Sequence, residues 1–227
     1  MEILNGKIKI FLIRHGRQES PLCNVDVKLA DEGRTQAQLV GRRLSGMEID
    51  AVYSSNLIRA IETAEIIKEE LCLDLEVKIS EDFRETEFGD MTGMSDEVLK
   101  VKFKDYFEKR EDCDEDIRIP GGENGEEVYK RMKMAMDMVI EDAKNNHYEN
   151  IVIVSHGGAI RCFLAGILKM PLGRRFMFAK TMENCSITEL NYYLHKNNFS
   201  IERINDYSHL EGREDLLRSS FDRNAKE

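Results

Sequence analysis

Two stretches of the chain, IKIFLIRHG at residues 8–16 and NIVIVSHGG at residues 150–158, each run from a continuous apolar segment into a histidine and a glycine. A continuous apolar run is typical of a strand that is covered on both faces of a parallel sheet. A helix-like segment follows each glycine. The two stretches therefore predict two buried strands of one sheet, each ending in a histidine.

Strand-like and helix-like segments alternate along much of the remaining chain. Further strands are expected at 51–55, 75–79 and near the carboxyl end, and helices at about 31–44 and 56–71, the second capped by Ser55 or Asn56. This alternation predicts an α/β three-layer sandwich, with a mostly parallel central sheet and helices on both faces.

The 227 residues are enough for one domain with a sizeable core. We expect a single domain over residues 1–210. The alternation breaks down at about 90–120, a charge-dense excursion that is either a solvated loop or a lid over the site. Residues 211–227 have little apolar periodicity and are expected to form a charged C-terminal tail.

Composition excludes several classes of function. The formal net charge of −10 argues against non-specific binding of nucleic acid, which needs a basic face. We expect no membrane span, because the apolar stretches are short and interrupted, and no signal peptide at the N-terminus. Five cysteines without CxxC spacing argue against a disulfide framework or a zinc site, so a cytoplasmic location is expected.

The two histidines that follow the apolar runs, His15 and His156, are expected to share one pocket. Ligands of open α/β sheets lie beyond the carboxyl ends of the strands, where helix N-termini offer free N–H groups. A metal is the main alternative ligand, but the chain has no HxH or HExxH, and Arg14 beside His15 would repel a divalent cation. The pattern therefore favours an anion.

Two further residues fit an anion site. Arg59 lies near the start of the helix predicted after strand 51–55, so it can point toward the same crevice. Glu85 follows the strand predicted at 75–79 and precedes a turn that contains glycine.

Four motifs, LIRHG, SSNLIRAIETA, FRETEFGDMTG and VSHGG, occur in an order and spacing that resemble the histidine phosphatase superfamily, also called the phosphoglycerate mutase-like family. The likeness covers roughly residues 8–210. It implies that His15 is the nucleophile, that Arg14, Arg59 and His156 grip the phosphoryl group, and that Glu85 is the proton donor.

The resemblance also implies contacts with phosphate or substrate from five other residues: Gly16, Gln18, Asn24, Gly157 and Asn184. The chain departs from the family pattern at two of the neighbouring positions. Gln18 stands where a hydroxyl residue is usual, and Pro21 replaces a common asparagine, for which Asn24 is the candidate substitute. Asn124, where the family often has serine, is expected to cap a helix.

These features predict a phosphatase that acts on a small phosphorylated metabolite through a phosphohistidine, without a metal or other cofactor. A phosphoglycerate mutase is the alternative. Mutases of the family resemble one another in a tryptophan after the first motif, whereas this chain contains no tryptophan. A non-catalytic module that binds a phosphorylated ligand is the third possibility. The sequence leaves the substrate, the oligomeric state and the role of His209 open.

Overall fold

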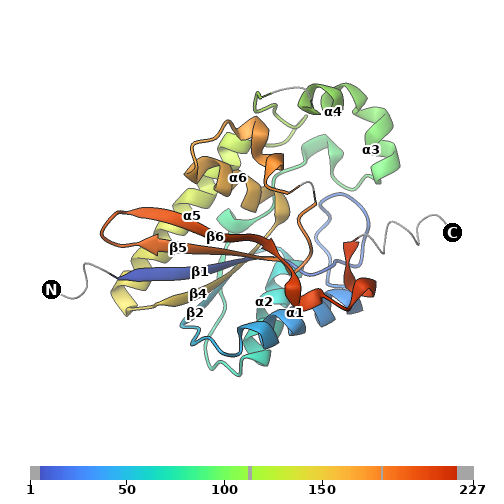
Figure 1. Ribbon diagram of the computed structural model, residues 1–227. Helices are drawn as coiled ribbons and strands as arrows, with labels where there is room; N and C mark the ends of the chain where they lie inside the picture. Colours follow the sequence, from blue (N-terminus) through green and yellow to red (C-terminus); the bar gives the residue numbers. More distant parts are fainter. Residues whose placement is uncertain (1–5, 112–113, 180, 219–227) are drawn as a thin grey trace.

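A six-stranded mixed sheet forms the centre of the molecule, in the order β3-β2-β4-β1-β5-β6. The computed structural model describes residues 6–111, 114–179 and 181–218 (Figure 1). The strands are β1 (Lys7–Arg14), β2 (Ala51–Ser55), β3 (Lys78–Ser80), β4 (Asn150–Ser155), β5 (Ile187–Tyr193) and β6 (Asn198–Asp206). The pairings among β3, β2, β4 and β1 are parallel, and β5 and β6 are added antiparallel.

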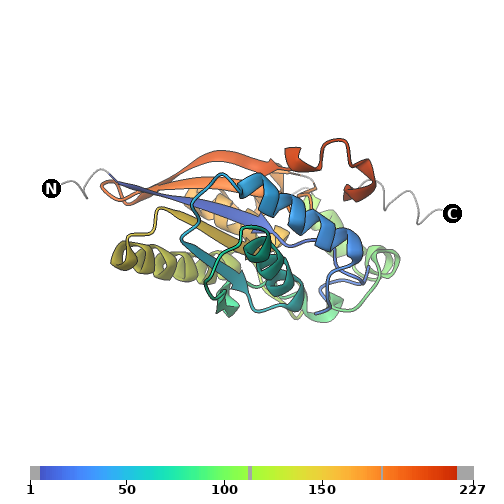
Figure 2. The same cartoon turned by 90° about the horizontal axis from the view of Figure 1, so that it is seen from below.

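Helices cover both faces of the sheet, as the sequence predicted (Figures 1 and 2). The two helices α1 (Asp31–Leu44) and α2 (Ile58–Glu70) pack on one face around a core that includes Val40, Ala64 and Val154. On the other face, α5 (Gly125–Asn146) and α6 (Gly157–Ile167) pack around Leu12, Met136 and Phe163. Both faces of β1 and β4 are thereby buried, which explains their unbroken apolar sequences.

The start of α2 differs from the sequence-based expectation. The helix begins at Ile58, and its N-cap is Leu57, whose side chain makes no capping hydrogen bond. Ser55 is instead the last residue of β2, and its hydroxyl accepts a hydrogen bond from the N–H of Leu57 at 3.2 Å. This leaves the Ser55 hydroxyl at the carboxyl edge of the sheet.

Residues 90–120 contain two short helices, α3 (Asp96–Lys102) and α4 (Lys104–Glu111), which stand apart from the sheet in Figure 1. The excursion has its own small apolar cluster, made by Met91, Leu99, Tyr106 and Ile119. The excursion is therefore a packed substructure rather than a solvated loop.

The excursion is joined firmly to the start of α5. The Asp116 carboxylate accepts hydrogen bonds from the N–H groups of Gly125 at 2.8 Å and Glu126 at 2.7 Å, and from Arg175 Nη1 at 2.9 Å. Asn124 caps α5 as expected, since its side chain accepts from the N–H of Glu127 at 3.0 Å in a reciprocal capping box.

The first residues of the predicted tail pack on the domain, together with Leu210 just before it. Leu210 and Leu216 are buried, and the Leu216 carbonyl accepts a hydrogen bond of 2.7 Å from Gln36 on α1. Residues 219–227 of that tail lie outside the described residues. Within the described part of the chain, no helix has the length and apolarity needed to cross a membrane.

Candidate active site

The two strand-end histidines lie side by side at the carboxyl edge of the sheet. Strands β1 and β4 are parallel neighbours whose register aligns Arg14 with Ser155, so the next residue of each strand leaves the sheet at the same level. The ring centroids of His15 and His156 are 4.9 Å apart, and both rings are buried. The structure thus brings together the two imidazoles that the sequence placed in one pocket.

Hydrogen bonds fix the tautomer of His15. Its Nδ1 lies 2.7 Å from the carbonyl oxygen of Gly16, which can only accept, so Nδ1 carries the proton. Its Nε2 lies 3.3 Å from Nε of Arg59, which can only donate. Burial, followed by the charges of Arg59 and Arg14, holds the pKa of His15 well below its usual value. The ring is neutral at pH 7, and Nε2 presents a lone pair toward the cavity.

His156 has one ring nitrogen engaged and one without a partner. Its Nε2 lies 2.8 Å from the hydroxyl of Ser55, whereas Nδ1 is buried and has no hydrogen-bond partner within the described structure. Nε of Arg14 is buried and unpartnered in the same way. Unpartnered buried nitrogens are rare in folded proteins, and two of them at one site suit an anion that accepts from both.

Arg59 is held in place from three sides. Its guanidinium donates to His15, to the Val25 carbonyl at 2.9 Å and to the Asn24 side-chain oxygen at 3.1 Å. The Asn24 amide in turn donates to the Thr86 carbonyl at 3.2 Å. Asn24 lines the cavity, and its two hydrogen bonds make it an orienting partner of Arg59.

Glu85 lies against the first turn of α6. Its carboxylate accepts hydrogen bonds from the N–H groups of Gly158 at 3.1 Å, Ala159 at 3.0 Å and Thr86 at 2.8 Å. A carboxylate has about four lone-pair positions, so three donors leave room for one proton.

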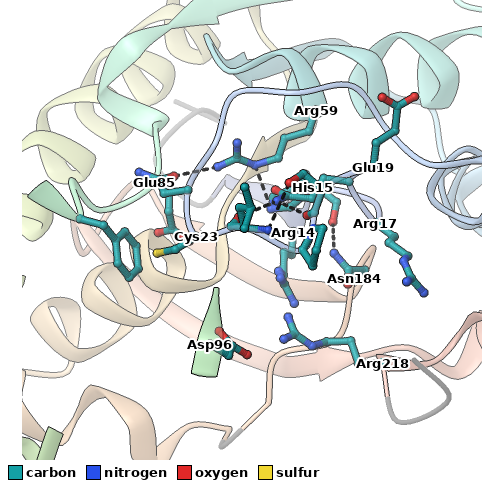
Figure 3. Close-up of a pocket in the computed structure, with 16 residues that line it drawn as sticks. Arg14, His15, Arg17, Glu19, Cys23, Arg59, Glu85, Asp96, Asn184 and Arg218 are labelled. Carbon is teal, nitrogen blue, oxygen red and sulfur yellow. Dashed lines mark hydrogen bonds between the residues drawn. The ribbon is translucent and has the colours of Figure 1, made fainter. Parts of the chain in front are cut away.

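His15, Arg59 and Glu85 line a cavity of about 480 Å³ (Figure 3), and the fully buried ring of His156 lies next to that of His15. Its walls include Arg14, His15 and Arg59 on one side and Glu85 on the other, with Asn184 nearby. The Asn184 amide donates to the His15 carbonyl at 3.0 Å and thereby supports the backbone of that histidine. In the described part of the chain, no group of three or more His, Cys, Asp or Glu side chains is arranged to hold a metal ion.

Two of the residues expected to contact phosphate make hydrogen bonds within the protein. The N–H of Gly16 donates to the Thr63 hydroxyl at 3.0 Å, and a Cβ at this position would lie 2.6 Å from the Gly33 carbonyl oxygen. Gly16 therefore permits close packing and has no free N–H for a ligand. The Gln18 amide lines the cavity but donates to the carbonyls of Ser20 at 2.7 Å and Leu22 at 3.3 Å, so it braces its own loop.

At Gly157, the lack of a side chain does keep space open next to charged groups. A Cβ at this position would lie 3.4 Å from Nε of Arg14 and 3.4 Å from Nη1 of Arg161. Gly157, Arg14 and Arg161 all line a smaller cavity of about 220 Å³ beside the first, and the absence of a side chain at Gly157 leaves both guanidiniums open to it. His209, in contrast, lines neither this cavity nor the one beside it.

The sequence analysis missed three residues of this region. Ser55 was assigned only to a helix cap, although its place at the end of β2 was the available signal. Arg131 on α5 donates to the carbonyls of residues 82, 84 and 85 and so holds the segment that carries Glu85. Arg218 reaches the cavity from the C-terminal segment, and nothing in the local sequence indicates this.

A mixed α/β sheet thus brings two imidazoles, two guanidiniums and a carboxylate together at one edge, an arrangement whose chemistry suits a compact anion. The chain belongs to the histidine phosphatase superfamily (branch 1), whose family model matches residues 10–207. The resemblance seen in the sequence is thus confirmed.

Named relatives include both phosphatases and mutase-like proteins. Phosphoglycerate mutase-like protein 4 of Arabidopsis thaliana is 35% identical over 216 residues, covering 89% of this chain and 87% of the relative. Putative phosphoserine phosphatase 2 of Hydrogenobacter thermophilus is 31% identical over 191 residues, covering 81% and 89%. A crystal structure of a phosphoserine phosphatase mutant from Entamoeba histolytica in complex with phosphoserine aligns with a TM-score of 0.69 at 27% identity, covering 89% of this chain and 99% of that one.

Proposed function

We propose that the protein is a metal-independent phosphomonoester hydrolase that acts on a small phosphorylated metabolite through a phosphohistidine at His15. The observation that carries this proposal is the state of His15. It is buried, neutral and fixed in the tautomer that presents the Nε2 lone pair beside two guanidiniums. Such a nitrogen is a competent nucleophile at neutral pH.

The main obstacle to the reaction is the negative charge of the phosphoryl group, which the cations of the site would offset. Charge spreads over the equatorial oxygens in the transition state, and donors fixed near them lower its energy. A unit charge pair at 4 Å contributes about 4 kcal/mol at an effective dielectric of 20. Arg14 and Arg59, with the unpartnered Nδ1 of His156, supply such donors.

In the first step, the His15 Nε2 lone pair attacks phosphorus, and the bond from phosphorus to the ester oxygen breaks. A protonated Glu85 gives its proton to that oxygen, and an alcohol leaves. In the second step, water attacks phosphorus and its proton passes to the Glu85 carboxylate. The bond between phosphorus and Nε2 then breaks and phosphate leaves. One carboxylate thereby serves both half-reactions.

The test is a phosphoenzyme trap. Rapid quenching with a ³²P-labelled ester, with chelator present, should give an acid-labile, base-stable adduct that His15→Ala abolishes. His195→Ala, which removes an exposed histidine remote from the cavity, is the matched control and should label normally. Full labelling of the His15→Ala variant would refute the assignment.

A mutase remains the alternative because some relatives carry mutase-like names. Its mark would be phosphoryl transfer between the hydroxyls of phosphoglycerate that depends on a bisphosphoglycerate primer. A protein that binds phosphate but hydrolyses no ester in a broad panel would instead be a binding module.

A further inference from the structure

The two strand-end histidines occupy equivalent places in the sheet, but opposite ring nitrogens are engaged by the protein. His15 uses Nδ1, which lies 2.7 Å from the carbonyl oxygen of Gly16. His156 instead uses Nε2, which lies 2.8 Å from the hydroxyl of Ser55. One ring is therefore held by the backbone of the next residue, and the other by a side chain from a neighbouring strand.

The hydroxyl of Ser55 can donate to His156. Ser55 is the last residue of β2 and is fully buried. Its oxygen already accepts a hydrogen bond from the N–H of Leu57 at 3.2 Å. Among the described residues, Nε2 of His156 is the one acceptor in hydrogen-bond contact with this hydroxyl. Because a buried hydroxyl without an acceptor costs free energy, the hydroxyl donates to Nε2, which is then unprotonated.

The surroundings of Nδ1 lead to the same assignment. His156 is the N-cap of α6, a position where a side chain often accepts from a free N–H of the first turn, but its ring makes no such bond. The N–H groups of Gly158 and Ala159 donate to Glu85 instead, at 3.1 Å and 3.0 Å. Among the described residues, Nδ1 thus has no donor from which to accept. We therefore assign the proton of the neutral ring to Nδ1.

The proton on Nδ1 lies on the side of the ring away from β2. Strand β4, which leads into His156, has β2 on one side and β1 on the other. Nε2 is directed at Ser55 on β2, and the two nitrogens of an imidazole point in widely different directions, so Nδ1 is directed toward the side of β1 and His15. Burial, followed by nearby positive charge, holds the pKa of His156 well below its usual value, so the ring is neutral at pH 7.

We propose that Ser55 is a positioning residue of this site: its hydroxyl donates to Nε2 of His156 and thereby fixes the neutral tautomer in which Nδ1–H is a donor to the phosphoryl group. The proposal rests on the proposed function for the identity of that anion. The two histidines then have different roles, because His15 presents a lone pair and His156 presents a proton. A neutral donor also avoids a further buried cation beside Arg14 and Arg59.

Nuclear magnetic resonance of the protein labelled with ¹⁵N-histidine tests the tautomer without any substrate. The couplings between ring nitrogens and ring C–H protons distinguish Nδ1–H from Nε2–H, and His156→Gln identifies the signals of this ring. We expect Nδ1–H in the wild type at pH 7, and a larger share of Nε2–H in Ser55→Ala, since no hydroxyl then donates to Nε2. A wild type with Nε2–H overturns the proposal, and so does a Ser55→Ala variant with the wild-type tautomer.

Two further variants assign the effect to the Ser55 hydroxyl. Ser54→Ala is the matched control, because Ser54 is equally buried on β2 but its hydroxyl donates to the Ser55 carbonyl at 2.9 Å. It should keep the wild-type tautomer, and a changed tautomer would overturn the assignment to Ser55. Ser55→Thr retains a hydroxyl and should keep Nδ1–H. If threonine prevents folding, the wild type and Ser55→Ala still decide the question.

Binding of inorganic phosphate, measured by calorimetry, links the tautomer to the anion. Ser55→Ala should weaken phosphate binding on the order of tenfold, the range for one hydrogen bond to a charged group. In a His156→Gln background the same substitution should cause no further loss, whereas a purely structural role would cause the same loss in both backgrounds. Equal losses in the two backgrounds overturn the proposal, and so does a wild type that binds no phosphate.

These measurements separate the proposal from the proposed function. Tautomer and phosphate affinity can be measured on a protein that hydrolyses no ester, so the role of Ser55 stands even if no phosphoenzyme forms at His15. Conversely, Nε2–H on His156 in the wild type refutes the role of Ser55 even if His15 is phosphorylated.

Discussion

Replacing Arg131 with methionine should destabilise the protein strongly and disturb the position of Glu85. Arg131 is 7% exposed. Its guanidinium makes five hydrogen bonds of 2.7–2.9 Å, to the carbonyls of Asp82, Arg84 and Glu85 and to both oxygens of Glu123. Methionine fills a similar volume but leaves three carbonyls and a largely buried carboxylate without this donor.

Breaking a buried ion pair by removing one partner costs about 3–5 kcal/mol, because the remaining charge stays buried. Arg84 lies 3.6 Å from Glu123 and retains part of the compensation, so the lower half of that range is expected. For a protein of this size, about 3 kcal/mol corresponds to a fall in Tm of about 6–12 °C.

Urea denaturation measures the free energy of unfolding, and a double-mutant cycle with Glu123→Gln isolates the pair. Arg118→Met is the matched control. Arg118 pairs with Glu127, but its side chain is 53% exposed, so the loss should stay below about 1 kcal/mol. A loss below about 1 kcal/mol for Arg131→Met as well would refute the reasoning.

Catalysis gives a second readout for Arg131. If it positions the acid, Arg131→Met should slow esters of basic alcohols more than p-nitrophenyl phosphate, whose leaving group needs little protonation. An equal loss for both kinds of ester would show that the residue acts on stability alone.

Two other changes give sharp expectations. Gly158→Ala should place a Cβ 2.5 Å from Glu85 Oε1 and 2.9 Å from Thr86 Oγ1, so the carboxylate must move. We therefore expect kcat for esters of basic alcohols to fall on the order of tenfold. Stopped-assay kinetics with alkyl and aryl phosphates check this, and unchanged kcat for both would contradict it. Burial lowers the pKa of His209 to about 4 in the folded protein. As the pH drops from about 6.5 toward 4, the unfolded state binds a proton at His209 and the folded state does not, so the free energy of unfolding falls. His209→Gln should flatten that fall by up to about 1.4 kcal/mol per pH unit in urea titrations, whereas the exposed His195→Gln should not; identical slopes would rule the idea out.

The core of the site follows from short-range patterns in the sequence. Two apolar strands with histidines at their ends must meet if they are parallel neighbours, and the register of β1 and β4 satisfies this. Arg59 and Glu85 follow strands β2 and β3 and reach the same edge. Because the carboxyl ends of neighbouring strands lie together, residues from separate local motifs meet at one cavity.

Other features depend on contacts between distant segments, which no local pattern encodes. Gly16 follows a strand in the way that phosphate-binding glycines do, yet Thr63 on α2 takes its N–H. The packed cluster within residues 90–120 could not be read from a charge-dense sequence. Arg218 comes to the cavity because Leu210 and Leu216 pack the preceding segment against the domain and because its own N–H donates to Glu183 Oε1 at 2.9 Å.

The hydrogen bonds of the Asp116 carboxylate limit which part of the 90–120 excursion can move away from the domain. Moving Asp116 away from the domain would break its hydrogen bonds with two N–H groups of α5 and with the Arg175 guanidinium at the same time. A displacement of the stretch that holds α3 and α4 would leave those three contacts in place, and this stretch carries Arg110 but not Arg175. Of the three arginines around the Phe176 ring, Arg110, Arg161 and Arg175, the one on α4 is thus the one that such a displacement would carry away.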